Sequence, residues 1–289
     1  MIKDIDTQAI FACIDGSHMS ESVCQYASWI AKANQRPLTL LHTIEHNQTA
    51  AVADLSGALS LGASEDLLSE LTDAEQKRSK LLVDQGHQML QLFKQQALEL
   101  GIDHVKTMQQ HGHLVESLID LEQQVRCLVI GIRGEQHDDQ RAGIGAQLET
   151  TLRTLHKPML VVNKEFSQPK TIMLAYDGSE SCNKALQMIV ERKVFEGLPC
   201  HLVHVEKAQS DINQTLHNAQ QQLQQAGHDV TVATVIGDPA ETLAKYQIDN
   251  DIDLMLMGAF SHNRFRDLLL GSFTAKMLDK TNRPLLLLR

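Results

Sequence analysis

Residues 10–17 read IFACIDGS, and residues 172–179 read IMLAYDGS. In both stretches a short apolar run ends in Asp-Gly-Ser, and the two triplets lie 162 positions apart. A run of this length and composition is typical of a buried strand, and the glycine lets the chain turn sharply where the strand ends. The chain therefore contains a structural unit that occurs twice.

The repeat extends over most of the chain. Leu41-His42 matches Val203-His204 at the same offset of 162, whereas Gly112 matches Gly237 at 125 and Lys157-Pro158 matches Arg283-Pro284 at 126. The drop in offset places 37 extra residues in the first copy, between His42 and Gly112. We expect two domains, residues 1–165 and 166–289, joined by the short polar stretch 163–169.

Short apolar runs alternate with helix-like stretches in both copies, which is the pattern of βαβ units around a parallel sheet. The alternation predicts an α/β fold with two tandem open parallel five-stranded sheets, each flanked by four helices. Gly101 and Gly227 are expected to end the second helix of each copy. The strands are expected at 9–14, 38–43, 104–109, 127–131 and 158–163, and at 171–176, 200–206, 229–235, 253–258 and 284–289.

The extra residues form an inserted segment at about 45–72, rich in Ala, Leu, Ser and Gly. The segment contains six leucines whose burial would stabilise the folded chain by roughly 25 cal/mol per Å² of apolar surface. This free energy favours docking by several kcal/mol even after the entropy lost on ordering the segment is subtracted. We expect residues 50–72 to pack over the carboxyl-end cleft of the first copy as a helical hairpin, or to form a contact between chains. Residues 72–75, Thr-Asp-Ala-Glu, have the pattern of a capping box, which predicts a long helix over 73–100.

The last predicted strand of each copy is almost entirely apolar. At the edge of a sheet such a strand exposes unpaired backbone groups and invites aggregation. We therefore expect the strands at 158–163 and 284–289 to pair with each other inside one chain.

The composition excludes several classes of protein. With 43% hydrophobic residues and no apolar run near the ~20 residues of a membrane span, the chain is expected to be globular and without a membrane partner. A net charge of −10 disfavours nucleic acids. The N-terminus lacks a signal-peptide pattern and the five cysteines form no CxxC pair, so we expect a cytoplasmic protein with buried thiols. No metal is firmly implied, because His111 and His113 are only a two-ligand fragment.

Candidate ligand-binding residues follow the strands of the second copy. In an open parallel sheet, ligands bind beyond the carboxyl ends of the strands, where the strand order reverses. Ala175-Tyr176-Asp177, Val205 and the stretch from Gly258 to Ser261 occupy such positions. Gly271-Ser272 opens the last helix, and amides at a helix N-terminus bind phosphate. On the residues alone, an ordinary turn and N-cap explains Gly271-Ser272 equally well.

The ordered set of these residues resembles the universal stress protein family. The stretch Gly258-x2-Ser261-x9-Gly271-Ser272 is similar to the family's nucleotide loop, G-x2-G-x9-G-[ST]. The likeness covers nearly the whole chain twice, as in tandem members, and the inserted segment is also similar to that of bacterial tandem members. It implies a Rossmann-like fold of the adenine-nucleotide α-hydrolase type in each half. It also implies that the two halves pair as a pseudo-dimer inside one chain, and a homodimer of whole chains is a further candidate assembly.

The resemblance implies that the second copy binds ATP. Asp177 would meet the ribose or the base edge, and Val205 would lie against adenine. Met257 and Gly258 would line the cleft, together with Ala175-Tyr176 at the end of the first strand.

The phosphates would meet the start of the last helix. Gly271, Ser272 and Phe273 would offer main-chain amides and one hydroxyl. Ser261 stands where the family has its second glycine, and its Cβ is expected to weaken ATP binding.

The first copy departs further from this pattern. It keeps Asp15, Gly131 and Gly134, but the next glycine, Gly145, follows after ten residues instead of nine and is followed by an alanine. Acidic residues outnumber basic ones in that loop. We expect the first copy not to hold ATP, and either another small ligand or a purely structural role stays open.

The function expected from these residues is regulatory binding of ATP in a stress response. Catalysis is expected to be absent or restricted to slow hydrolysis, because no base, nucleophile and orienting group come together around Asp177. His42 and His204 are expected to be hydrogen-bonded structural histidines. The alternative is a nucleotide-free stress or scaffold protein that acts through protein contacts, and an adenylate-forming or hydrolytic enzyme on the same fold lacks a recognisable catalytic set.

Overall fold

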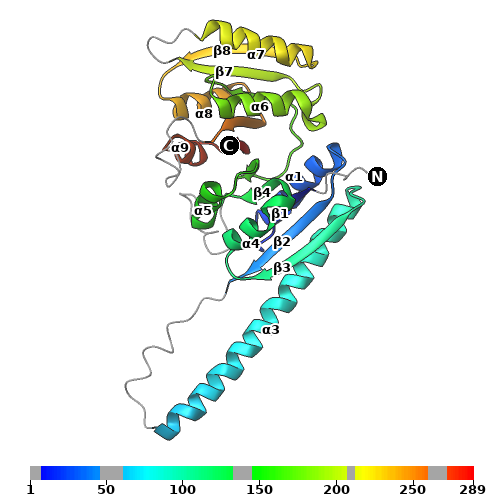
Figure 1. Cartoon of the computed structure of the whole chain (residues 1–289), viewed down its shortest axis with the longest axis vertical. Coiled ribbons are helices and arrows are strands. Elements are labelled where there is room, and N and C mark those ends of the chain that lie inside the picture. The colour runs from blue at the N-terminus through cyan, green and yellow to red at the C-terminus, as the bar shows by residue number, and fades with distance from the viewer. Residues whose placement is uncertain (1–7, 46–60, 133–144, 207–211, 260–271) are drawn as a thin grey trace.

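A computed structural model of the chain describes residues 8–45, 61–132, 145–206, 212–259 and 272–289 (Figure 1). Within these ranges ten strands form one sheet in the order β3-β2-β1-β4-β5-β10-β9-β6-β7-β8. Every predicted strand is present. The strands are β1 (Ala9–Cys13), β2 (Leu38–Ile44), β3 (Val105–His111), β4 (Val125–Gly131), β5 (Met159–Val162), β6 (Ile172–Ala175), β7 (Cys200–Glu206), β8 (Val230–Ile236), β9 (Leu254–Gly258) and β10 (Leu285–Leu288).

Helices connect the strands in the predicted alternation, four in each half of the described chain. They are α1 (Ser20–Ala33), α3 (Leu61–Glu99), α4 (Leu114–Leu121), α5 (Ala146–Thr154), α6 (Glu180–Glu191), α7 (Asn213–Gln225), α8 (Pro239–Asp249) and α9 (Ser272–Lys280).

The two predicted sheets are joined by their last strands into one continuous sheet. β5 and β10 pair antiparallel, with Leu160 opposite Leu286, while the other strand pairs of the sheet are parallel. All eight side chains of the two strands are buried. The expected pairing of the last strands is confirmed, and it leaves neither strand at an edge.

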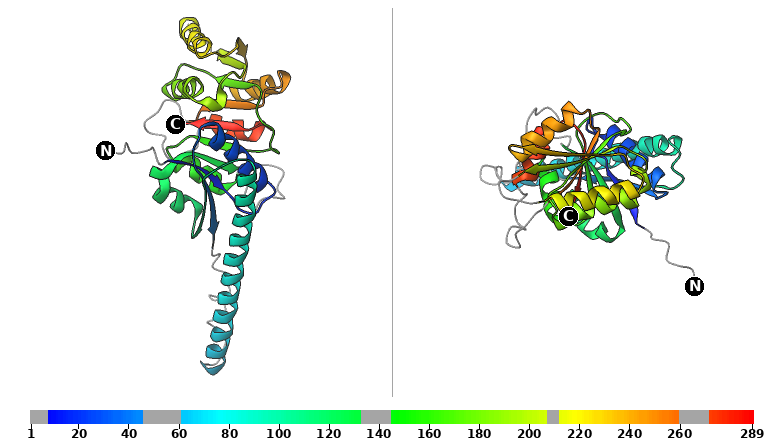
Figure 2. Two further views of the ribbon diagram at one scale, coloured as in Figure 1. Left: turned by 90° about the vertical axis from the view of Figure 1, so that its right-hand side faces the viewer. Right: turned by 90° about the horizontal axis from the view of Figure 1, so that it is seen from above.

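Helices cover both faces of the sheet (Figure 2). Buried side chains of α1, α3, α6 and α7 pack on one face, and those of α4, α5, α8 and α9 pack on the other. Each of these two clusters contains residues from both halves. Along β5 and β10 the side chains alternate between the two faces of the sheet. Leu160 and Leu286 therefore belong to one cluster, and Met159 and Leu285 belong to the other. The two halves therefore share their hydrophobic core.

Glycines end the second helix of each half as predicted. Gly101 and Gly227 have φ values of +87° and +89°, a region that glycine adopts at little cost. After Gly101, the Ile102 amide donates back to the carbonyl of Ala97 at 3.2 Å. After Gly227, the His228 amide donates in the same way to the carbonyl of Leu223 at 3.1 Å. This is the Schellman arrangement, which satisfies carbonyls at the helix end.

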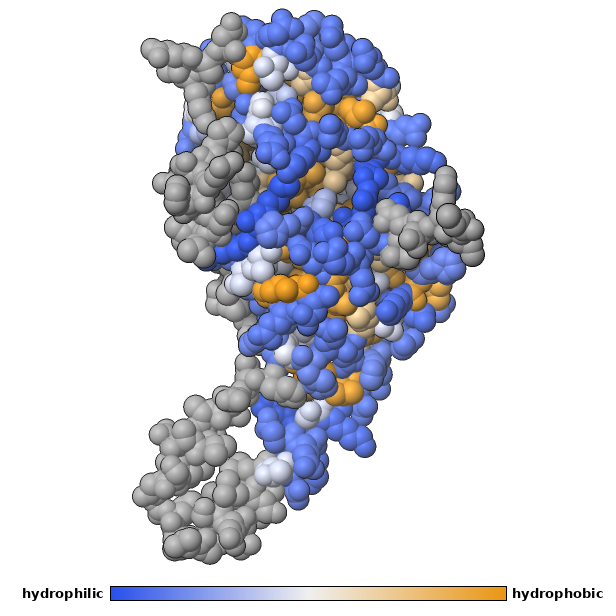
Figure 3. Space-filling model, in the orientation of Figure 1, coloured by the Kyte–Doolittle hydropathy of each residue, from blue (hydrophilic) through white to orange (hydrophobic). Residues whose placement is uncertain are grey.

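Helix α3 differs from the prediction at its start. It begins at Leu61 and runs through Thr72 without interruption, so the expected capping box lies inside a helix. The preceding residues LGASEDLLSEL are rich in good helix formers, which continue the helix upstream. Its first turns lead away from the sheet (Figure 1), and residues 72–78 are exposed in a mostly hydrophilic part of the surface (Figure 3).

The expected docking of residues 50–72 over the cleft is therefore wrong for residues 61–72. Residues 46–60 lie outside the described residues. A contact between chains through this segment stays a prediction.

All five cysteines are free and buried, as expected. Burial raises the pKa of the Cys24 thiol to about 11 and those of Cys127 and Cys200 to about 12. These thiols stay protonated and unreactive near neutral pH. In the part of the chain that the structure describes, no helix has the length and apolar character of a membrane span.

The shared core predicts that the junction stabilises the whole molecule. Leu286 is 3% exposed, so Leu286→Ala should lower the free energy of unfolding by about 2–5 kcal/mol through lost burial and a cavity. Urea unfolding checks this. Ile236→Ala is the control, because Ile236 is 81% exposed and its truncation should change stability by less than about 0.5 kcal/mol. Equal stability of the two variants would contradict the shared core.

Candidate functional site

The sheet has two places where a ligand site is expected. Strand order reverses between β1 and β4 in the N-terminal half and between β6 and β9 in the C-terminal half. Ligands of open α/β sheets bind beyond the carboxyl ends of the strands at such points. Because β5 and β10 run antiparallel, the carboxyl ends of the two halves lie at opposite edges of the sheet. The two candidate sites are therefore separate.

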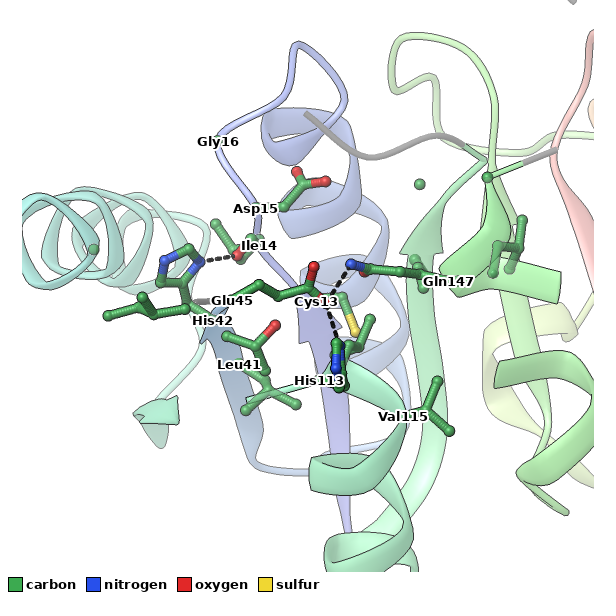
Figure 4. A pocket seen from close by; sticks show the side chains of 18 of the residues that line it. Cys13, Ile14, Asp15, Gly16, Leu41, His42, Glu45, His113, Val115 and Gln147 are labelled. Atoms are coloured by element: carbon green, nitrogen blue, oxygen red, sulfur yellow. Dashed lines mark hydrogen bonds and ion pairs between the residues drawn. The ribbon is translucent and has the colours of Figure 1, made fainter. Parts of the chain in front are cut away.

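The N-terminal half holds a cavity of about 930 Å³ at its point of reversal (Figure 4). This volume is within the usual range for small-molecule sites. The ends of β1, β2 and β4 form its floor, and α3 and the starts of α4 and α5 form its walls. We call it the N-terminal cavity. Its apolar lining includes Ile14, Leu41, Ile44, Leu82, Met89, Leu114, Val115, Ile130, Ile132 and Leu148.

A carboxylate that lines this cavity is held by two solvent-exposed side chains. Glu45, just after β2, accepts a hydrogen bond at Oε1 from Gln147 Nε2 at 2.7 Å. His113 Nδ1 lies 3.2 Å from the same oxygen (Figure 4). Gln147 is in the first turn of α5 and His113 is the N-cap of α4, so Glu45 joins the starts of both helices. Its side chain is only 18% exposed.

Asp15 organises the turn after β1. Its Oδ1 accepts hydrogen bonds from the Ser17 amide at 3.0 Å and from the Ser20 hydroxyl at 2.9 Å. Gly16, which lies between Asp15 and Ser17, has a φ of +87°. Cys13 also lines the cavity, and burial, with a contribution from the Asp15 charge, raises the pKa of its thiol. The cavity therefore offers a carboxylate but no reactive thiolate.

Helix α3 approaches the cavity closely at Gly86. A Cβ at this position would lie 2.7 Å from both His42 Cδ2 and Gln109 Nε2, so only glycine fits without displacing a neighbour. His42 is fixed by a 2.8 Å hydrogen bond between its Nδ1 and the carbonyl of Ile14. The residue of the C-terminal half that matches Gly86 is Ile212, because the two lie equally far before the glycines that end the second helix of each half.

The structure brings four of the predicted site residues of the C-terminal half together. Ala175 is in register with Met257 on one side and with Val203 on the other. Ala175, Val205 and Met257 are at most 9% exposed and belong to the cluster under α8 and α9, against which Phe273 packs. Met257 therefore faces the core. Asp177 is exposed and its Oδ1 accepts the Ser179 amide at 2.9 Å, which repeats the turn at Asp15.

Tyr176 points away from these residues. It is 4% exposed, it belongs to the cluster on the opposite face, and its hydroxyl donates to Asn183 Oδ1 of α6 at 2.7 Å. His204 Nδ1 lies 2.9 Å from the carbonyl of Tyr176. His42 and His204 thus make the same backbone contact, so the predicted hydrogen bonds are confirmed, while a purely structural role of the two histidines stays a prediction.

Gly258 has a packing role at the end of β9. A Cβ there would lie 2.8 Å from Ser181 Cβ and 3.2 Å from the Cys182 amide nitrogen, both in the first turn of α6. Gly258 therefore allows α6 to lie close to the strand.

Helix α9 is tied to the same strand end. The Thr274 hydroxyl donates to the carbonyl of Ala259 at 2.6 Å, and the Ala259 amide donates to the carbonyl of Leu288 at 2.7 Å. The predicted Ser272 is the first residue of α9, although its side chain is outside the described part. Ser261 and Gly271 lie outside the described residues. The start of α9 is thereby positioned at the carboxyl edge of the sheet.

No metal centre is found in the described ranges, where no group of three His, Cys, Asp or Glu side chains is arranged to hold an ion. His111 is in β3 and is exposed, whereas His113 faces Glu45.

Comparison with known proteins identifies the family. The model of the universal stress protein family matches residues 7–163 and 206–289. The universal stress protein Slr1230 of Synechocystis sp. is 36% identical over 97% of this chain and 99% of its own length. The chain belongs to the universal stress protein family. Since both halves match, it is a tandem member.

Two solved structures share the fold over nearly the whole chain. A universal stress protein from Archaeoglobus fulgidus matches over 97% of this chain and 98% of its own, with a TM-score of 0.69 and 18% identity. A putative universal stress protein from Pseudomonas aeruginosa matches over 97% of this chain and 92% of its own, with a TM-score of 0.61 and 15% identity. A universal stress protein solved in complex with cAMP matches over 43% of this chain and 98% of its own, with a TM-score of 0.37 and 19% identity.

Glu45, which lines the N-terminal cavity, was not among the predicted site residues. Glu45 gave one usable signal: the residue that follows the matched strand of the other half is Lys207, so the charge is reversed. Its partners could not be seen, because His113 and Gln147 are 68 and 102 positions away.

The packing at Gly258 predicts a paired substitution effect. Gly258→Ala should lower the free energy of unfolding by about 1–3 kcal/mol, because the new methyl group overlaps Ser181. Adding Ser181→Gly removes both of the overlapping side-chain atoms and should restore part of the loss. Urea unfolding of the two single variants and the double variant measures the coupling. Strictly additive effects would show that α6 does not pack against Gly258 as described.

Proposed function

We propose that the C-terminal half binds ATP as a regulatory ligand and that the protein has at most slow hydrolytic activity. The observation that carries this proposal is the position of α9, whose first turn is tied to the end of β9 through Thr274 and Ala259. The helix start thus lies beside the point where strand order reverses between β6 and β9.

The residues that open α9 suit a polyphosphate. The sequence places Gly271 before the first helical residue, Ser272, and unpaired amides at a helix start attract anions. The loop before it contains Arg264 and Arg266 against Asp267, which adds positive charge. Ser261 adds a Cβ where the family loop has glycine, so we propose a weakened but intact site.

The strand ends would receive the nucleoside. Asp177 is exposed at the end of β6 and can accept hydrogen bonds from ribose hydroxyls or the base edge. Adenine would lie against Val205 and Ala175 on the neighbouring strands, whose side chains are 9% and 7% exposed. Met257 would support these side chains from the core.

A regulatory role fits the chemistry of the described side chains. The Oδ1 of Asp177 accepts the Ser179 amide, and His204 is 4% exposed with its Nδ1 bonded to a carbonyl. Burial, together with the Asp177 charge, raises the pKa of the Cys182 thiol. None of these three groups is poised to activate a water molecule for attack on a phosphate.

The first test is ATP titration calorimetry on the whole chain. We expect one ATP per chain, and loss of binding in Gly271→Val, whose branched side chain would occupy the space of the phosphates. Gly145→Val is the matched control in the other half, because Gly145 has φ −61° and ψ 136°, which valine adopts readily.

Two results would contradict the proposal. Loss of ATP binding in Gly145→Val with retention in Gly271→Val would assign the nucleotide to the N-terminal half. No ATP binding by the folded parent chain would favour the alternative, a nucleotide-free scaffold that acts through protein contacts.

Hydrolysis should be slow even at saturating ATP. Bound phosphates without an activated nucleophile gain limited acceleration, so we expect turnover far below the ~10 per second of an ordinary enzyme. Release of radiolabelled phosphate at saturating ATP, with ATP in excess over the protein, measures the turnover rate. A rate in the ordinary enzyme range would exclude a purely regulatory role.

A further inference from the structure

The two halves carry different residues at matched positions of the sequence that follow or begin corresponding strands and helices. The first residue after the second strand is Glu45 in one half and Lys207 in the other. The N-cap of the third helix is His113 in the N-terminal half and Asp238 in the C-terminal half. The second residue of the fourth helix is Gln147 in the N-terminal half and Phe273 in the C-terminal half. The hydrogen-bonded group around Glu45 therefore belongs to the N-terminal half alone.

Glu45 occupies a position that favours an anion. Its carboxylate lies between the first turns of α4 and α5, held by Gln147 at 2.7 Å and His113 at 3.2 Å. The starts of two helices carry partial positive charge, which stabilises a nearby negative group. The protein thus supplies with its own side chain the negative charge that a ligand phosphate would otherwise bring.

The rest of the cavity also opposes a phosphate. The amide of Gly145, at the start of α5, already donates to the carbonyl of Ile132 at 3.1 Å. Asp15 and Glu116 line the same cavity, and Arg78 is the one Lys or Arg among the described residues that line it. In a partly buried site, like charges at short range repel far more strongly than in water.

We propose that Glu45 is the specificity-determining residue of the N-terminal cavity, which excludes phosphorylated ligands and binds a small molecule with a positively charged amine on an apolar body. The carboxylate receives the amine, and the apolar lining, including Leu41, Leu82 and Met89, receives the body. The inference goes beyond the proposed ATP site, since it concerns the other half and the opposite edge of the sheet.

Two probes of nearly equal shape and opposite charge test the proposal. Phenethylamine and 3-phenylpropionate are titrated into the whole chain, labelled with ¹³C at the methionine methyl groups and saturated with ATP. Met89 lines the cavity, and its signal is assigned with Met89→Leu. We expect phenethylamine to shift the Met89 signal and to bind at least about tenfold more tightly than 3-phenylpropionate.

Variants of Glu45 decide whether this residue sets the preference. Glu45→Gln should reduce the preference for the amine at least about tenfold, and Glu45→Lys should reverse it. Glu99→Lys is the control, because it makes the same change in net charge at the exposed end of α3. Its preference should equal that of the parent chain.

Several results would overturn the proposal. They are equal affinity for the two probes in the parent chain, no shift of the Met89 signal with phenethylamine up to about 10 mM, or an unchanged preference in Glu45→Lys. Failure of the proposed ATP function remains distinguishable, because it is seen as missing ATP binding before either probe is added.

Discussion

The antiparallel pairing of β5 with β10 is the contact on which the rest of the fold depends. Both strands are four residues long and apolar throughout. If left unpaired, each would be an exposed edge strand prone to aggregation. Their pairing removes both edges at once and makes a single ten-stranded sheet. Because it is antiparallel, it also places the carboxyl ends of the strands of the two halves at opposite edges of the sheet, so that the two candidate sites are separate.

The two halves keep the same turn and vary the side chains around it. Asp15 and Asp177 each accept the amide of the serine two residues later, and His42 and His204 each bond to a backbone carbonyl at the end of the first strand. These contacts shape the backbone, so they are shared. The charge differs instead, because Glu45 matches Lys207 in the sequence.

The strand positions were predictable from the sequence because short apolar runs and turn residues act locally. The pairing of the last strands was predictable for a similar reason, since an all-apolar edge has few alternatives. The start of α3 was not, because the pattern at Thr72 has the form of a cap but the helix continues through it. A capping box marks the start of a helix only where the upstream residues leave the helical conformation, and here they are good helix formers.

The residues alone were enough to predict the α/β class, the internal repeat, the family and the candidate residues at the strand ends, because these depend on periodicity, spacing and turn chemistry over short stretches. They could not determine that Tyr176 and Met257 point into the cores on opposite faces of the sheet, or that Gly258 makes room for α6. The arrangement of the N-terminal cavity was decided only by the tertiary structure. Glu45 meets partners 68 and 102 positions away, and contacts between such distant residues exist only once the sheet has brought two helix starts to the same edge.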